Sequence, residues 1–210
     1  MREESRARIM AAALELIATQ GFEATSLAAI TRAAGVSQGL ASYYFPAKRD
    51  LLVAVFGQWL DAITGAMIAA AEDAGESGPD AALARLIDMV LGGARSDLAV
   101  TRLMLAVMVQ PAVRSVLAEA ESAAEERVAA AEAAVASLFA ARGAEDPALE
   151  QVMFRSVLEG VTFKLTVYED TYPIEAARRH VYRLYRLPEP EPMFDEHPGP
   201  IRLRAPLRRE

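Results

Sequence analysis

The 210-residue chain contains no cysteine and only two histidines, His180 and His197. Without cysteine, disulfides, thiolate metal ligands, iron–sulfur clusters and a cysteine nucleophile are excluded. Two histidines also make a histidine-rich metal site or histidine-based catalysis unexpected. The longest uncharged run, residues 103–113, is far shorter than the ~18 apolar residues of a membrane span. We therefore expect a soluble, cytoplasmic protein that is not an enzyme, has no membrane partner and requires neither cofactor nor metal.

Strand signals are scarce as well, because alternating β-branched runs between turns do not recur. Alanine and leucine at helical spacing dominate instead. A hydrophobic content of 53% with 24% charged residues is typical of a folded soluble protein. The pattern predicts an all-α fold with about nine helices. These span residues 5–19, 25–34, 37–43, 47–71, 80–93, 97–109, 111–142, 148–169 and 173–187.

Residues 27–44 have the form of a helix-turn-helix motif. Two short helical segments meet at Gly35, a residue type that tolerates a positive φ angle. Packing of the two segments on each other leaves Gln38, Leu40 and Tyr43 on the outer face of the second, which fits a DNA major groove ~12 Å wide. Gln38 carries both the donor and the acceptor needed to recognise an adenine edge. These features predict an N-terminal three-helix DNA-binding head.

Groups suited to phosphate contact surround the second helix of the motif. Lys48 falls in the first turn of the next helix, where free N–H groups and the helix dipole favour an anion. The net charge of −7 does not oppose DNA binding, because residues 1–50 carry six basic and five acidic groups and screening confines repulsion by the rest to ~10 Å. The predicted DNA-binding residues are Thr25, Ser26, Ser37, Gln38, Gly39, Leu40, Ser42, Tyr43, Tyr44 and Lys48.

Residues 8–52 resemble the DNA-binding head of the TetR family of one-component transcriptional regulators. The segment Ser42-Tyr43-Tyr44-Phe45 is most similar to the choline-sensing betaine-operon repressors within that family. The resemblance implies a homodimeric repressor that binds a palindromic operator in double-stranded DNA and is released by a small-molecule effector. The matching positions are Arg8-Ile9, Ala12-Ala13, Gly21-Phe22, Thr25-Ser26-Leu27, Ile30, Ala33-Ala34-Gly35-Val36-Ser37, Gly39, Tyr44-Phe45, Lys48 and Leu51-Leu52.

The resemblance further implies a helical body that forms the dimer through its last two long helices. The predicted helices 148–169 and 173–187 carry wide apolar stripes, and Ser156 and Gly160 permit close helix approach. An intramolecular core would produce the same stripes. The predicted dimer-interface residues are Leu149, Val152, Met153, Ser156, Gly160, Ile174, Val181 and Leu184.

A ligand pocket in this body would be lined by methionine and aromatic side chains, which form adaptable apolar walls. The same side chains at helical spacing are equally typical of an ordinary core. A cation such as choline would need an aromatic cage, for which Trp59 with Phe163 or Tyr168 is a candidate. The predicted pocket residues are Trp59, Ile63, Met67, Met89, Met104, Met108, Glu159, Phe163 and Tyr168.

Three segments follow from these patterns: a DNA-binding domain over residues 1–50, a ligand-binding and dimerisation domain over 51–187, and a mobile tail rich in proline and arginine over 188–210. The glutamates between residues 119 and 132 are expected to form a solvated face. Two alternatives remain open. One is an activator, or a regulator with a protein partner, that uses the same head. The other, more remote, is a helical small-molecule-binding protein or enzyme.

Overall fold

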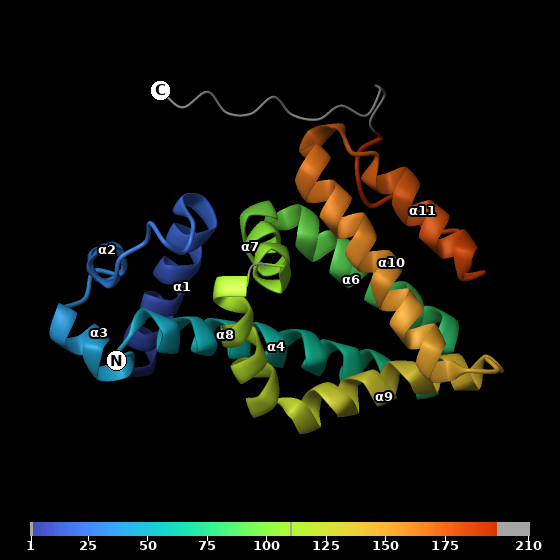
Figure 1. Ribbon diagram of the computed structural model, residues 1–210. Coiled ribbons are helices and arrows are strands. Elements are labelled where there is room, and N and C mark those ends of the chain that lie inside the picture. Colours follow the sequence, from blue (N-terminus) through green and yellow to red (C-terminus); the bar gives the residue numbers. More distant parts are fainter. Residues whose placement is uncertain (1, 110, 197–210) are drawn as a thin grey trace. The chain divides into compact units, whose positions relative to one another are not determined.

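The computed structural model describes the backbone of residues 2–109 and 111–196 and the side chains of residues 3–105 and 114–196. All regular structure in these residues is helical, which confirms the predicted all-α class. Figure 1 shows the helices in chain order. They are α1 (Arg2–Gln20), α2 (Leu27–Ala33), α3 (Gln38–Tyr44), α4 (Lys48–Glu72), α5 (Ala74–Ser77), α6 (Pro79–Ser96), α7 (Leu98–Val109), α8 (Pro111–Ala123), α9 (Glu125–Ala141), α10 (Pro147–Tyr168), the short 3₁₀ helix η1 (Glu169–Thr171) and α11 (Ile174–Leu184).

The helices form two compact units. Unit 1 comprises Met1–Thr64 and Ala99–Val128, and unit 2 comprises Gly65–Leu98 and Ala129–Glu210. The N-terminal helices therefore share a unit with α7 and α8, although these helices lie far away in the sequence. The unit boundary within α4 falls after Thr64, whereas the sequence suggested a head that ends at residue 50.

Local sequence signals set the short helices of unit 1. The Ser26 hydroxyl accepts a hydrogen bond from the Ala29 N–H at 3.1 Å and caps α2. Ser37 caps α3 in the same way through the Leu40 N–H at 3.2 Å. Between them, Gly35 has a φ of 63°, a conformation that glycine adopts without a steric penalty. These caps and this turn confirm the predicted helix boundaries of the motif.

The core of unit 1 is built from apolar residues at helical spacing. Among its fully buried members are Ile9, Ala13, Ile30, Ala41 and Leu51. The helical stretch Lys48–Ser77 is, within the described residues, long and apolar enough to cross a membrane by length and composition alone. However, the first part of this stretch buries Leu51, Leu52, Val55, Phe56 and Leu60, as the core helix of a folded unit does.

The predicted single helix over residues 111–142 is wrong, because the structure divides it into α8 and α9 at Ala124. The Ala124 N–H donates to the Glu121 carbonyl, three residues back, at 3.0 Å. No glycine or proline marks this position, so helix propensity does not reveal the break. Tertiary packing accounts for it better: Val116, Ala120 and Ala124 are buried in the unit 1 core at four-residue spacing.

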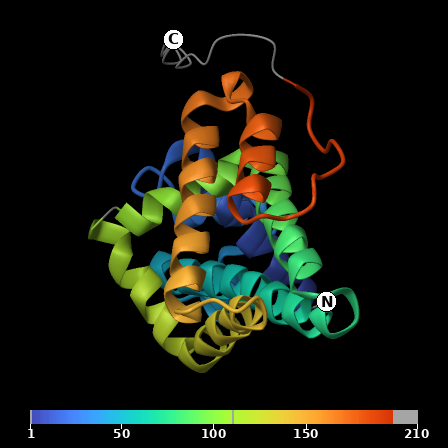
Figure 2. The same ribbon diagram turned by 90° about the vertical axis from the view of Figure 1, so that its right-hand side faces the viewer.

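Unit 2 is organised around α6, α10 and α11, which lie side by side in Figures 1 and 2. Leu83, Ile87 and Leu91 of α6 are fully buried. Phe154 and Tyr185 pack edge to face with ring centroids 5.0 Å apart. Such an arrangement suits the electrostatics of two aromatic rings and joins α10 to the end of α11.

The helix predicted over residues 80–93 extends three residues further, to Ser96. Within this helix, Gly92 serves a packing function. A Cβ atom at this position would lie 2.7 Å from the terminal methyl carbon of Met193. Glycine thus permits a close approach of the C-terminal segment to α6.

The expectation of a loose tail from Pro188 onward needs correction for residues 188–196. The Met193 and Phe194 N–H groups donate to the Glu175 carboxylate at 3.2 and 3.1 Å. The Glu191 carbonyl accepts from the Arg178 guanidinium at 2.8 Å. These contacts hold this segment on unit 2, while residues 197–210 of the predicted tail lie outside the described residues.

Candidate nucleic-acid interface

Helix α3 presents a polar face to solvent and an apolar face to the unit 1 core. Ala41 is fully buried, and Phe45, directly after the helix, is 3% exposed. The opposite face carries the predicted contact residues. Ser37, Gln38, Gly39, Ser42 and Tyr43 are all exposed, and Leu40 is half-buried.

Tyr43 is the most exposed large side chain of this face, with 71% of its surface accessible. Its ring meets the half-buried ring of Tyr44 edge to face, with centroids 5.3 Å apart. This contact directs the Tyr43 ring without burying its hydroxyl. The two tyrosines therefore differ: Tyr43 is placed for an external partner, and Tyr44 supports it from the side of the core.

Arg8 on α1 fixes the turn that positions α3. Its guanidinium donates hydrogen bonds to the carbonyls of Ala34 and Gly35, the latter at 3.1 Å. A Cβ atom on Gly35 would lie only 2.7 Å from Nη2 of Arg8. Sequence reasoning missed this function because Arg8 is 27 residues from Gly35. The one signal in the sequence was that Arg8, together with Ile9, is among the positions of residues 8–52 that resemble the TetR family.

Lys48 points inward, toward the loop between α1 and α2. Its ammonium donates to the carbonyls of Phe22 and Thr25 at 2.7 and 3.0 Å and lies 3.9 Å from the centre of the Phe22 ring. Two of its three N–H groups are thus used within the protein. Lys48 therefore stabilises the loop between α1 and α2. Its contact with DNA stays a prediction.

The start of α4 differs from the open anion site that the sequence suggested. The Asp50 carboxylate accepts a hydrogen bond from the Ala47 N–H at 2.9 Å. This acidic side chain occupies the position where a phosphate would otherwise interact with the helix N-terminus. The Ala47 N–H is therefore not available for a phosphate in this structure.

Thr25 is corrected as a candidate DNA contact. It is 1% exposed, and its hydroxyl donates to the Gly21 carbonyl at 2.8 Å. Its side chain closes the loop between α1 and α2 from inside. The neighbouring Ser26 is exposed and combines its capping role with access to solvent.

The predicted pocket residues are distributed over both units. In unit 1, Met104 lies in the core and Trp59 packs partly buried against it, while Ile63 is half-buried and the Met108 side chain lies outside the described residues. In unit 2, Met67 packs against the core, and Tyr168 stacks on Tyr172 with centroids 6.4 Å apart.

Three other members of the predicted pocket reach the surface of unit 2. Met89 is 37% exposed and Phe163 is 49% exposed. Glu159 forms an ion pair with Arg155, one helical turn earlier, at 3.5 Å. These positions correct the expectation that they line an enclosed cavity within this unit.

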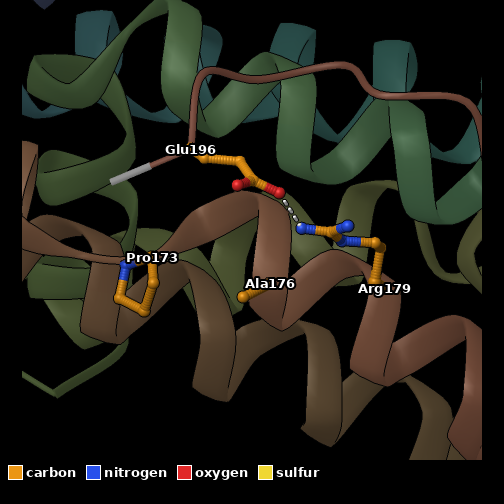
Figure 3. Close-up of a pocket in the computed structure, with 4 residues that line it drawn as sticks. All are labelled: Pro173, Ala176, Arg179 and Glu196. Atoms are coloured by element: carbon orange, nitrogen blue, oxygen red, sulfur yellow. Dashed lines mark hydrogen bonds and ion pairs between the residues drawn. The ribbon is translucent and has the colours of Figure 1, made fainter. Parts of the chain in front are cut away.

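Unit 2 has a shallow surface pocket of about 130 Å³, lined by Pro173, Ala176, Arg179 and Glu196 (Figure 3). Arg179 and Glu196 form an ion pair across it. None of these residues was predicted to bind a ligand. The volume is well below the ~300 Å³ at which ligand pockets begin, so we assign no effector to it.

Most of the predicted dimer-interface residues form an exposed stripe on α10. Leu149, Val152 and Met153 are 55%, 46% and 50% exposed, and Ser156 and Gly160 follow on the same face. Leu184 on α11 is 54% exposed. In contrast, Ile174 and Val181 are 4% and 2% exposed and belong to the core of unit 2. Their inclusion in the predicted interface was wrong, because α11 is amphipathic and its apolar side packs into the core of unit 2.

Comparisons with known proteins agree with this geometry. Residues 9–55 match the profile of the bacterial regulatory proteins of the tetR family. The HTH-type transcriptional regulator BetI of Ectopseudomonas mendocina (strain ymp) is 35% identical over 88 residues, which cover 42% of this chain and 45% of BetI. The chain spans less than half the length of the curated relatives it matches.

The fold extends the likeness beyond the head. The fatty acid degradation regulator FadR from Bacillus halodurans has a TM-score of 0.70 at 20% identity, covering 86% of this chain and 93% of its own. A transcriptional regulator from Saccharomonospora viridis, solved in complex with choline, has a TM-score of 0.67 at 18% identity, covering 88% and 96%.

The helix-turn-helix geometry and the match over residues 9–55 together define an N-terminal head similar to that of the TetR family of bacterial regulatory proteins. The likeness to solved structures extends over the all-helical fold.

Proposed function

We propose that the protein binds a palindromic operator in double-stranded DNA as a homodimer, acts as a repressor, and leaves the operator when a small molecule binds. The observation that carries the proposal is the outer face of α3, where Gln38 and Tyr43 are exposed on a helix anchored by buried apolar residues. A helix of this kind enters a major groove with its first turn closest to the bases.

DNA binding is tested by selection of genomic fragments with the purified protein, followed by affinity measurements on the recovered site. Gln38→Ala and Tyr43→Ala should each weaken binding by roughly tenfold, because a base or phosphate contact of this kind is worth about 1–3 kcal/mol. Gln58→Ala is the matched control, since Gln58 is an exposed glutamine on α4 outside the α3 face. Equal affinities of all three variants and the parent would refute the assignment of α3.

The homodimer is supported by the stripe on α10. Apolar side chains exposed at Leu149, Val152, Met153 and Phe163 follow helical spacing, with the small residues Ser156 and Gly160 between them. Small residues let two helix backbones approach, and the larger ones fill the remaining space. A second copy of this chain could bury the stripe by symmetry, as closed dimers do.

Oligomeric state is tested by sedimentation of the parent and of Met153→Glu. A charge in the centre of a buried interface should shift the protein toward monomers. Met89→Glu is the control, because it makes the same change at an exposed methionine on α6. A parent that sediments as a monomer at all concentrations would refute the homodimer, and equal effects of the two substitutions would refute the α10 interface.

The proposed effector is a small molecule, as for relatives solved with ligands. The solved relatives include proteins in complex with choline, stearoyl-CoA and malachite green. The apolar character of Trp59 and Met104 within unit 1 suits an effector with an apolar part. Release of bound operator DNA on addition of each of these compounds tests the class. An effector of different chemistry is indicated if none of the three releases DNA.

A further inference from the structure

Arg49 is the second residue of α4, and its guanidinium contacts α8 within unit 1. Nη1 donates to the Ser115 hydroxyl at 3.0 Å, and Nη2 donates to the Ser115 carbonyl at 3.3 Å. Nη2 also pairs with the Glu119 carboxylate at 2.8 Å. One arginine at the start of α4 is thus held by two residues that lie 66 and 70 positions further along the chain.

A second ion pair joins α4 to the other end of this region. Arg127 on α9 pairs with Asp61 on α4. The charges are reversed relative to the first pair, because α4 supplies the cation at residue 49 and the anion at residue 61. Between the two pairs, Val116 and Ala120 are buried in the unit 1 core. Polar contacts thus join α4 to α8 through Arg49 and to the start of α9 through Arg127, and α8 contributes buried residues to the same core.

The other charged groups in the first turn of α4 are committed to the head itself. Lys48 donates to carbonyls of the loop between α1 and α2. Asp50 accepts the Ala47 N–H. Arg49 differs from both, since its partners lie outside the helix-turn-helix. Its side chain also keeps 46% of its surface exposed, so an external anion has access to it.

We propose that Arg49 is a DNA-phosphate contact that Glu119 withholds, so that α8 lowers the affinity of the head for DNA. This inference rests on the proposed DNA-binding function. An exposed ion pair such as Arg49–Glu119 is weak, whereas a guanidinium can bind a phosphate through two parallel hydrogen bonds. A phosphate near the start of α4 therefore competes with Glu119 for the same N–H groups. Glu119 does not contact DNA in this proposal; it positions the Arg49 guanidinium.

The test compares Glu119→Gln with Glu121→Gln, measuring affinity for the recovered operator by fluorescence anisotropy at several salt concentrations. Both substitutions remove one negative charge from an exposed site on α8, but only Glu119 contacts Arg49 in the described structure. Glu119→Gln should tighten binding by roughly two- to fivefold, the range that an exposed ion pair provides. Glu121→Gln should give a smaller gain from general electrostatics.

Arg49→Ala identifies the route of the effect. The loss of affinity should be larger in the Glu119→Gln background than in the parent. In that background the slope of log affinity against log salt concentration should also fall by the amount expected for about one phosphate contact. Arg49→Lys should keep part of the gain, because it retains the charge. Far-ultraviolet circular dichroism checks that each variant is folded.

Equal gains from Glu119→Gln and Glu121→Gln, or an equal cost of Arg49→Ala in both backgrounds, would overturn the inference while DNA binding itself stands. Failure of the parent and of all variants to bind DNA at low salt would overturn the proposed function together with the inference. The two failures are thus distinguished by the parent protein alone.

Discussion

Replacing Arg178 by methionine should destabilise unit 2 by about 3 kcal/mol or more, because it breaks a buried ion cluster from one side. Arg178 is 3% exposed. Its guanidinium donates to both carboxylate oxygens of Asp88 at 2.6 and 3.0 Å, and to Glu175 at 3.3 Å. The hydrogen bond to Asp88 is the largest cause that raises the pKa of Arg178 above its ordinary value, so this side chain stays charged.

The loss of unfolding free energy depends on how well Asp88 and Glu175 are solvated or paired once Arg178 is removed. Asp88 keeps 32% of its side chain exposed and can regain water. Glu175 is 2% exposed and cannot. It would retain its two N–H donors from the C-terminal segment, but the only cation left to it in the described structure would be Arg179, at 4.0 Å. Methionine fills most of the vacated volume, so the cavity contribution is small and the weakly paired buried charge dominates.

This reasoning predicts a reversal of sign for a second substitution. In the parent, Glu175→Gln should cost roughly 1–2 kcal/mol, since it weakens a charge-assisted hydrogen bond. In the Arg178→Met background the same change should restore about 1–2 kcal/mol, since it removes a buried charge that only the 4.0 Å contact with Arg179 still balances, while an amide oxygen still accepts from the backbone.

Urea unfolding at fixed protein concentration measures these changes, with separate probes for the two units. The single tryptophan, Trp59, packs in unit 1, and four of the six tyrosines, residues 168, 172, 182 and 185, lie in unit 2. For Arg178→Met, the urea midpoint followed by tyrosine circular dichroism should therefore fall more than the midpoint followed by tryptophan fluorescence. A loss below about 1 kcal/mol for Arg178→Met, or a further loss on adding Glu175→Gln, would refute the argument.

Three further predictions concern the head and the pH dependence. Arg8→Ala should weaken operator binding, measured by anisotropy, without loss of helix content. Gly35→Ala should also weaken binding and should lower the free energy of unfolding by about 1–2 kcal/mol through its positive φ angle, measured by thermal unfolding. Unchanged affinity in both variants would contradict the role of Arg8 in positioning the turn. Ser37→Ala should cost about 0.5–2 kcal/mol as a lost helix cap, whereas Ser37→Thr should restore most of it in the same unfolding assay. Burial, and then Asp88, raise the pKa of Tyr182 from 10.0 to about 12, so the folded state favours the protonated phenol and stability should fall as pH rises between these values; urea midpoints that do not change over this interval would contradict that expectation.

Local features of the fold could be predicted from the sequence because their causes are local. Ser26 and Ser37 cap the helices that follow them, and Gly35 takes the positive φ that its position between two short helices requires. The exposed face of α3 followed from the spacing of Ala41 and Phe45, which is fixed by helix geometry. No long-range contact is needed for any of these conclusions.

The features that sequence reasoning missed depend on partners far away in the chain. Ala124, where the helix breaks, is buried against residues of the unit 1 core, and Gly92 lies against Met193, about a hundred residues further along the chain. Helix α11 is amphipathic, but its sequence does not say whether the apolar side packs within the chain or on a second copy, so Val181 could be assigned to the core only once α6 was placed beside it. Glycine in a helix is ambiguous for the same reason, since it permits both a break and a close approach.

The basic residues of the head show the same limit and lead to a functional consequence. Sequence reasoning treated Lys48 as a phosphate-binding group, yet its ammonium holds two backbone carbonyls, as the guanidinium of Arg8 does at the turn before α3. Arg6 lies over the Phe45 ring, and Arg49 pairs with Glu119. Four cations thus contact other groups of unit 1, so the proposed DNA recognition by α3 would rely mainly on the neutral groups of Gln38 and Tyr43. In a head with so little cationic charge available for DNA, one additional phosphate contact would be a large fraction of the electrostatic affinity. We therefore expect the weak ion pair between Arg49 and Glu119 to influence DNA binding more here than it would in a strongly basic head.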